Sequence, residues 1–160
     1  MDRPTVLVIT GPTAAGKSRV APELAQNWDA VIVSVDAMQV YRGLDIGTAK
    51  VSPEEQALVH HEGIDVVAPA QPFDAAQFQL LAHQAIQNFP SVILAGGTPF
   101  YIRSAIRGLV EEPPADLDLR NELELLPSPY EALLRVDPDL AKRLHPYDTM
   151  RIVRGLEVFY

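Results

Sequence analysis

The residues best suited to chemistry form a glycine-rich segment near the N-terminus. It consists of Gly11, Pro12, Thr13, Ala14, Ala15, Gly16, Lys17 and Ser18 and matches the pattern G-x-x-x-x-G-K-[ST]. The glycines let backbone N–H groups curl around phosphate oxygens, and the start of a following helix adds partial positive charge. Lys17 supplies a charge for a terminal phosphate, and the Ser18 hydroxyl can ligate Mg²⁺. The segment therefore predicts a phosphate-binding loop.

Two further side chains follow apolar runs that are typical of buried strands. Asp36 comes after AVIVSV at 30–35, and Thr98 comes after SVILA at 91–95 and two glycines. In open α/β sheets, ligands bind beyond the carboxyl ends of the strands, so both side chains are expected beside the phosphate-binding loop. Asp36 could hold Mg²⁺ through water or act as a general base. The alternatives are a turn cap for Asp36 and a helix N-cap for Thr98.

The elements that would position these residues alternate between strand and helix. Runs that are apolar at every position indicate strands buried on both faces. The expected strands are 5–10, 30–35, 91–95 and a short one at 64–67; helices are expected after the glycine-rich loop to about Trp28, over 74–89 with Asp74 as N-cap, and after Thr98. This order predicts an α/β fold, with a P-loop NTPase-like parallel sheet flanked by helices.

The texture of the sequence changes after Gly108. Breakers at 111–116 and 126–130 separate short, charged segments that are expected to form a small helical insertion near the C-terminal end. Residues 141–154 hold four basic residues against one acidic residue, which makes them the best local basic patch. We therefore expect three segments: a P-loop core at 1–110, a short helical insertion at 111–145, and the start of a core helix at 146–160.

Composition narrows the class of protein. The 160 residues carry 13 Lys and Arg against 21 Asp and Glu, a net charge of −8, with 48% hydrophobic residues. These values fit a globular domain and argue against a nonspecific nucleic-acid binder. The sequence has no Cys, which excludes disulfides, a catalytic thiol and thiolate metal sites. No run reaches the roughly 18–20 apolar residues of a membrane span, so a cytoplasmic protein is expected. His60 and His61 are interpreted as surface or capping residues.

Four blocks, in order and in register, resemble the tRNA dimethylallyltransferase family. They are GPTAAGKS, SVDAMQVYRGLDIGTAK (34–50), AGGTPFY (95–101) and LHPYDTMRIVRGLEVF (144–159). The resemblance spans about the first half of a typical member. It implies transfer of a dimethylallyl group from dimethylallyl diphosphate to the exocyclic amino group of the adenine next to the tRNA anticodon. The glycine-rich loop would then hold the donor diphosphate with Mg²⁺ through Thr13–Ser18, in place of ATP.

The same resemblance implies that the helical insertion at 111–145 binds tRNA, and it implies roles for individual residues. Asp36 corresponds to the general base, and Thr98 to the residue that assists diphosphate departure. The residues implied to contact the tRNA anticodon stem-loop are Asp36, Ala37, Met38, Gln39, Thr98, Arg120, Thr149, Met150, Arg151, Ile152 and Val153. A monomer is expected for the full-length family.

Other functions fit parts of the same sequence. One is an isopentenyltransferase that acts on free adenine nucleotides, which shares the P-loop half. Another is a P-loop nucleotide kinase or binding module, which predicts ATP binding and an arginine-rich lid that is not evident here. A third is an inactive fragment that folds without turnover.

Overall fold

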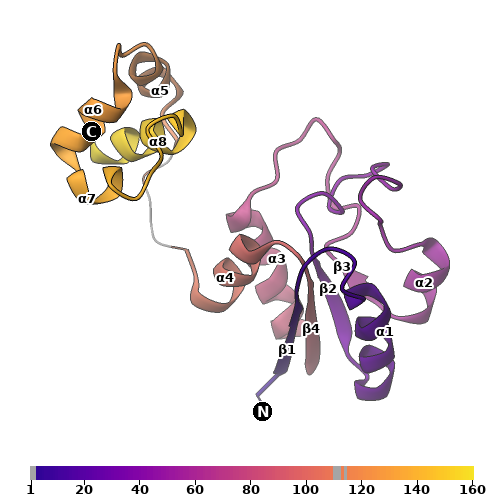
Figure 1. Cartoon of the computed structure of the whole chain (residues 1–160). Coiled ribbons are helices and arrows are strands. Elements are labelled where there is room, and N and C mark those ends of the chain that lie inside the picture. Colours follow the sequence, from indigo (N-terminus) through magenta and orange to yellow (C-terminus); the bar gives the residue numbers. More distant parts are fainter. Residues whose placement is uncertain (1–2, 110–112, 114) are drawn as a thin grey trace. The chain divides into compact units, whose positions relative to one another are not determined.

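The computed structural model describes residues 3–109, 113 and 115–160. Contacts divide the chain into two compact units, Met1–Leu109 and Val110–Tyr160. Figure 1 shows a sheet with its helices in the first unit and helices alone in the second. Each unit is described by itself.

The first unit contains a parallel sheet in which the carboxyl ends of three strands lie side by side. Its strands are β1 (Thr5–Thr10), β2 (Val31–Val35), β3 (His61–Glu62) and β4 (Ser91–Gly96), in the spatial order β1-β4-β2-β3. The register pairs Gly96 at the end of β4 with Thr10 on one side and with Val35 on the other. The expected parallel α/β sheet is confirmed, and the chain leaves three neighbouring strands at one edge.

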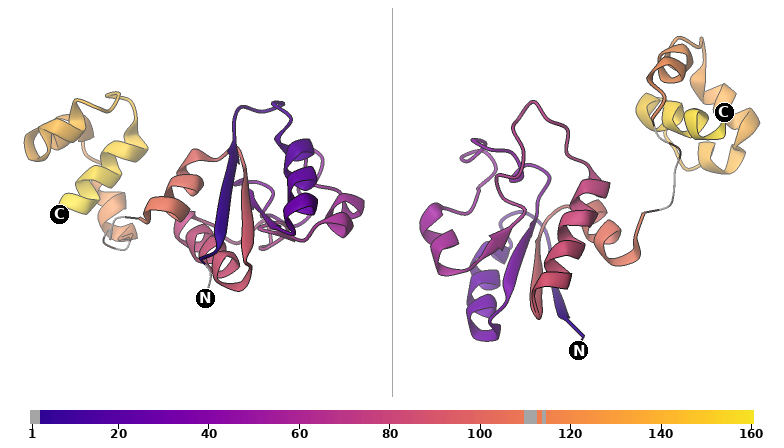
Figure 2. Two further views of the ribbon diagram at one scale, coloured as in Figure 1. Left: turned by 90° about the horizontal axis from the view of Figure 1, so that it is seen from below. Right: turned by 180° about the vertical axis from the view of Figure 1, so that it is seen from behind.

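Helices cover both faces of this sheet. Val33 of β2 and Leu94 of β4 pack toward α3 (Ala75–Asn88) and α4 (Pro99–Arg107), whereas Ile32 and Ile93 pack toward α1 (Lys17–Trp28). Figure 2 shows α1 on one side of the strands and α3 and α4 on the other. Because successive side chains of a strand point to opposite faces, strands covered on both faces need apolar residues at nearly every position.

Local sequence sets the helix boundaries. Asp74 accepts hydrogen bonds from the backbone N–H groups of Ala76 and Gln77, and the Gln77 side chain accepts from Asp74 N–H, so the expected N-cap of α3 is confirmed as a capping box. Ser52 and Glu55 form the same arrangement at α2 (Pro53–Leu58).

The expectation of a strand at 64–67 is wrong. The strand beside β2 is instead the two-residue β3, and Val67 forms only an isolated parallel bridge with Tyr41. The physical reason lies just before and within the apolar run, because Gly63 (φ +80°) and Asp65 (φ +54°) adopt left-handed backbone conformations that interrupt an extended strand.

Gly96 permits the close approach of β2 and β4. A Cβ at this position would lie 2.1 Å from the carbonyl oxygen of Val35. We therefore expect Gly96→Ala to force the strand ends apart and to destabilise the first unit by about 1–3 kcal/mol. Urea unfolding checks this, with Gly97→Ala as the matched control, since the nearest atom to a Cβ there lies 4.0 Å away. Equal midpoints for the two variants would contradict the expectation.

The second unit has its own apolar core. It comprises α5 (Leu117–Glu124), α6 (Pro129–Val136), α7 (Pro138–Ala141) and α8 (Thr149–Phe159). The buried core residues are Leu123, Leu133, Ala141, Ile152, Val153 and Leu156. Gly155 lets α8 approach Leu140, whose Cδ2 would lie 2.8 Å from an added Cβ. The structure thus places residues 149–159 with α5–α7, and the division into segments 111–145 and 146–160 stays a prediction. Half of the breaker expected at 111–116, namely residues 111, 112 and 114, lies outside the described residues.

Across the ranges that the structure describes, no helix combines the length and the apolar character that crossing a membrane requires.

Candidate phosphate-binding and catalytic site

The glycine-rich loop runs from the end of β1 into α1, as the motif predicts. Gly16 stands before the helix with φ +83°, and Ala14 also has a left-handed backbone with φ +65°. These conformations turn the chain sharply, so that α1 begins at Lys17 with its N-terminal end at the sheet edge. A curled loop followed by a helix N-terminus offers backbone N–H groups and partial positive charge to an anion.

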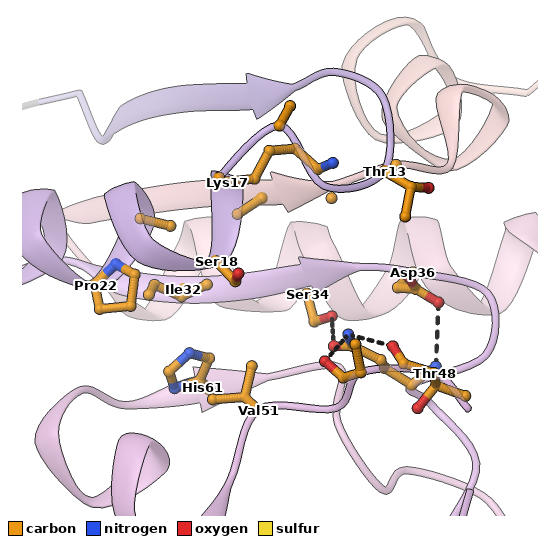
Figure 3. A pocket seen from close by; sticks show the side chains of 18 of the residues that line it. Thr13, Lys17, Ser18, Pro22, Ile32, Ser34, Asp36, Thr48, Val51 and His61 are labelled. Atoms are coloured by element: carbon orange, nitrogen blue, oxygen red, sulfur yellow. Dashed lines mark hydrogen bonds between the residues drawn. The ribbon is translucent and has the colours of Figure 1, made fainter. Parts of the chain in front are cut away.

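Lys17 turns back onto its own loop. Its Nζ donates hydrogen bonds to the carbonyl oxygens of Gly11 at 2.9 Å and Pro12 at 2.8 Å. The ammonium group therefore stays at the mouth of the loop, where Figure 3 shows it near Thr13 and away from Ser18. The geometry gives the loop a positive charge fixed beside its N–H groups.

Asp36 follows β2 and closes a turn with its carboxylate. Its Oδ1 accepts hydrogen bonds from Met38 N–H at 2.8 Å and Gln39 N–H at 3.3 Å. Asp36 also lines the same cavity as Thr13–Ser18. The turn-cap interpretation and the position beside the phosphate-binding loop thus hold together, because one oxygen can order the turn while the carboxylate stays at the cavity.

Thr98 joins the ends of β2 and β4. It stands at the N-terminal boundary of α4, but its side chain makes no capping hydrogen bond there. Instead its Oγ1 accepts from Ala37 N–H at 3.2 Å, and its own N–H donates to the Val35 carbonyl at 3.2 Å. Thr98 is therefore the N-cap residue by position, but its hydroxyl does not cap the helix and keeps a proton to donate.

The glycine-rich loop and Asp36 line a cavity of about 200 Å³, whereas Thr98 lies just beyond the lining residues Gly96 and Gly97. Its lining combines the loop Thr13–Ser18 with Asp36, Gln39 and the glycines Gly96 and Gly97. Figure 3 shows the side chains converging from β2, α1 and the segment around Thr48. The size and the mixture of N–H groups, hydroxyls and one carboxylate suit a small phosphorylated ligand.

Sequence reasoning missed some of the polar lining. The sequence favours a surface or capping role for His61, yet this residue is half-buried and lines the cavity with Ser34 and Thr48. Burial lowers the pKa of His61, although the hydrogen bond between its Nδ1 and the Val59 carbonyl acts in the opposite direction. The pairing of β3 with β2 places His61 here, and no local sequence pattern predicts that pairing.

Gln39 lies at the cavity with its side-chain amide already engaged. Its Nε2 donates to the carbonyls of Thr48 at 3.2 Å and Ala49 at 3.3 Å, and its Oε1 accepts from the Ser34 hydroxyl at 2.9 Å. Both amide protons are therefore used within the protein. Next to it, Met38 is exposed and Ala37 is partly exposed.

The other residues of the predicted tRNA-contact set belong to the second unit. Thr149, Met150 and Arg151 are exposed at the start of α8, with Met150 83% exposed, whereas Ile152 and Val153 are buried in the core of that unit. Arg151 pairs with Asp148 through Nη1 and Oδ2 at 2.6 Å. The exposed side chains of this stretch are thus confined to its first three residues.

Arg120 belongs to a buried charge cluster that sequence reasoning did not find. Its Nη2 lies 2.8 Å from Oε2 of Glu157, whose side chain is only 2% exposed. Arg154 Nη1 lies 2.9 Å from the same oxygen, and Asp116 N–H donates to Glu157 Oε1 at 2.7 Å. The hydrogen bonds from Arg120 and Arg154 outweigh burial and lower the pKa of Glu157 to about 2.

A parallel sheet covered by helices, whose first strand passes through a glycine-rich loop into α1, defines this chain as a P-loop α/β protein. Comparison with known families then gives a narrower result, since the model of the family described as IPP transferase matches residues 39–160. The chain belongs to the IPP transferase family.

Individual relatives agree with this assignment. The chain is 46% identical to tRNA dimethylallyltransferase 2 of Geotalea uraniireducens, over 99% of this chain and 54% of that protein. It is also 46% identical to tRNA dimethylallyltransferase of Methylococcus capsulatus, with the same two coverages. The chain therefore spans about half the length of these curated relatives.

Solved structures show the same likeness. The full-length tRNA isopentenylpyrophosphate transferase of Bacillus halodurans matches with a TM-score of 0.65 at 36% identity, over 96% of this chain and 55% of that one. A eukaryotic dimethylallyltransferase described as acting on tRNA matches with a TM-score of 0.82 at 27% identity, over 98% of this chain and 42% of that one.

Proposed function

We propose that this chain carries the donor-binding and catalytic part of an enzyme that transfers a dimethylallyl group from dimethylallyl diphosphate to the exocyclic amino group of the adenine next to the tRNA anticodon. One observation carries the proposal: Gly96 at the end of β4 is the register partner of both Thr10 on β1 and Val35 on β2. This pairing puts a phosphate-binding loop, Asp36 and Thr98 at one edge of the sheet. Family membership supports the choice of donor and acceptor.

The donor diphosphate fits the loop Gly11–Ser18. Diphosphate oxygens accept hydrogen bonds from the curled backbone N–H groups, and Lys17 exchanges its two carbonyl acceptors for phosphate oxygens. The residues also fit Mg²⁺, because Ser18 and Asp36 offer hard oxygen donors on the same cavity. In that case Ser18 would hold the ion, and when bound the ion neutralises diphosphate charge.

Asp36 and Thr98 fit the two proton-handling tasks of the reaction. The adenine amino nitrogen forms a bond to C1 of the dimethylallyl group, while the C1–O bond breaks and its electron pair leaves with the diphosphate. Asp36 takes the proton that the amino nitrogen loses. Thr98, whose Oγ1 is fixed by Ala37 N–H, donates its own hydrogen bond to the departing oxygen.

The acceptor would meet exposed residues in both units. Ala37 and Met38 are accessible next to Asp36; in the second unit Thr149–Arg151 are exposed and Arg120 is partly exposed. Cationic side chains can neutralise RNA phosphates, so these residues are the proposed contacts with the anticodon stem-loop. Both substrates would be met in the cytoplasm.

Donor selectivity tests this proposal. Isothermal titration calorimetry is expected to detect Mg²⁺-dependent binding of dimethylallyl diphosphate, and Lys17→Met should weaken it about 10- to 150-fold, since a charge-assisted hydrogen bond contributes roughly 1.5–3 kcal/mol. Arg103→Met is the matched control, because it removes a cation from α4 in the same unit, where Arg103 lies over the Phe100 ring.

The alternatives predict different results in the same experiments. Tight ATP binding without diphosphate binding would identify a nucleotide kinase or binding module and overturn the proposal. Prenyl transfer to AMP but not to an anticodon stem-loop would identify an enzyme of free nucleotides. Donor binding without transfer to either acceptor would identify a chain that folds without turnover.

A further inference from the structure

Lys50 forms a fully satisfied ionic cluster beside the site, although it does not touch the cavity. Its side chain is 4% exposed, and its Nζ donates to the Tyr41 carbonyl at 2.7 Å, Asp45 Oδ1 at 2.8 Å and Asp65 Oδ1 at 2.6 Å. An ammonium group has three N–H donors, and here each has its own acceptor. A buried lysine with a complete set of partners fixes the segments that carry those partners.

Those segments are the two sides of the loop 42–50 and the stretch at 65–67. Arg42 donates to the carbonyls of Asp65 at 2.9 Å and Val66 at 3.0 Å, so the start of the loop is tied to the same stretch. Lys50 ties its end there through Asp65. Burial is the largest influence on the pKa of Lys50 and lowers it, but Asp45 and Asp65 together outweigh burial and raise the pKa. The ammonium group therefore stays charged.

The fixed loop in turn orients Gln39. The two carbonyls that receive the Gln39 amide, those of Thr48 and Ala49, immediately precede Lys50. The third partner of that amide is Ser34 on β2. Figure 3 shows these hydrogen bonds as a continuous set between β2 and the loop. Gln39 thus connects the loop to the sheet.

The last connection runs from Gln39 to the proposed base. The backbone N–H groups of Met38 and Gln39 both donate to Asp36 Oδ1. One of these donors belongs to Gln39 itself, so the anchored side chain of Gln39 restrains the backbone that holds the carboxylate. From Lys50 to Asp36, the connections are hydrogen bonds joined by short stretches of backbone, all within the first unit.

We infer that Lys50 is a positioning residue, which acts through the carbonyls of residues 48 and 49 and through Gln39 to hold Asp36 for proton removal. The inference rests on the proposed function for the role of Asp36. A misplaced catalytic group loses rate even when substrate binding is intact, and a displacement of about 1 Å can cost on the order of 100-fold. Lys50 should therefore affect turnover and leave the phosphate-binding loop unaltered.

The lack of cysteine makes a chemical test possible. Lys50→Cys removes the ammonium group, and alkylation with 2-bromoethylamine in denaturant, followed by refolding, restores an ammonium group on a side chain of nearly lysine length. The unmodified variant is expected to lose roughly 10- to 100-fold in kcat with dimethylallyl diphosphate and an anticodon stem-loop. Its Kd for the donor should stay close to that of the original chain, and alkylation should restore most of the rate. Arg103→Cys, carried through the same steps, is the matched control.

Amide hydrogen exchange gives a second readout that needs no turnover. Exchange at Met38 and Gln39 should accelerate in Lys50→Cys and slow again after alkylation. If the original chain transfers no prenyl group, the proposed function fails. Unchanged exchange at Met38 and Gln39 in Lys50→Cys would separately overturn the inference that Lys50 holds this turn. Undiminished kcat in folded Lys50→Cys would overturn the inference while the proposed function stands, and lost donor affinity would overturn it in favour of a general structural role. If Lys50→Cys does not fold, Asp45→Asn and Asp65→Asn weaken single arms of the cluster, and undiminished kcat in both would overturn the inference.

Discussion

Asp36→Asn is expected to reduce prenyl transfer by about 10²–10⁴-fold, the usual cost of losing a general base. The amide keeps an oxygen that can accept from Met38 N–H and Gln39 N–H, so the turn after β2 should survive. Asparagine cannot take the proton from the adenine amino group. Single-turnover measurement of prenyl transfer at saturating donor isolates this step, and calorimetry checks that donor affinity is nearly intact.

Asp29→Asn is the matched control for this experiment. Asp29 ends α1 in a left-handed conformation (φ +49°), which asparagine tolerates well. The substitution Asp29→Asn removes the same negative charge as Asp36→Asn, but away from the cavity. If Asp36→Asn abolishes Mg²⁺-dependent diphosphate binding and spares the rate at saturation, Asp36 holds the metal ion and is not the base.

Glu157→Gln is expected to destabilise the second unit by on the order of 2–4 kcal/mol. Removal of one partner from a buried ion pair leaves the other charges without compensation, here on Arg120 and Arg154. The lower part of the usual range applies, because Arg120 is 35% exposed and water can solvate it. Denaturant unfolding of the full chain measures the loss of stability. Glu122→Gln, at an exposed position of α5, supplies the control.

The pH dependence gives this prediction a sign. Folding lowers the pKa of Glu157 from 4.5 to about 2, so its ion pairs stabilise the folded state fully above pH 4.5. That stabilisation is lost as the pH falls from 4.5 toward 2, because the unfolded state binds a proton first. The stability difference between the original chain and Glu157→Gln should therefore shrink across this interval. A difference that stays constant would contradict the assignment.

The site was predictable from sequence where short-range pattern and sheet geometry agree. The motif at 11–18 and the apolar runs before Asp36 and Gly96 are local, and parallel strands must bring their carboxyl ends together. The positions of His61 and β3 were not predictable from the sequence. The apolar run at 64–67 favours a strand there, but the left-handed backbone of Gly63 and Asp65 interrupts the extended conformation just before and within that run.

Two charge clusters escaped prediction for a different reason. Arg154 and Glu157 have helical spacing, but Arg120 reaches Glu157 across 37 residues. Lys50 reads in sequence as an ordinary charged loop residue, and only the pairing of 39–42 with 65–67 brings Asp65 to it. Charged residues far apart in sequence carry no periodic signal, so their partners become known only from the folded chain.

The hydrogen bonds of Lys17 to Gly11 and Pro12 make the glycine-rich loop an intramolecular competitor for its own cation. An incoming ligand must offer the ammonium group better acceptors than two amide carbonyls. The oxygens of a diphosphate carry full negative charge and meet that condition, whereas an uncharged alcohol or ester of the same prenyl group does not. The loop would thus select ligands by their charge, and it would disfavour the dephosphorylated donor whatever the shape of its hydrocarbon chain.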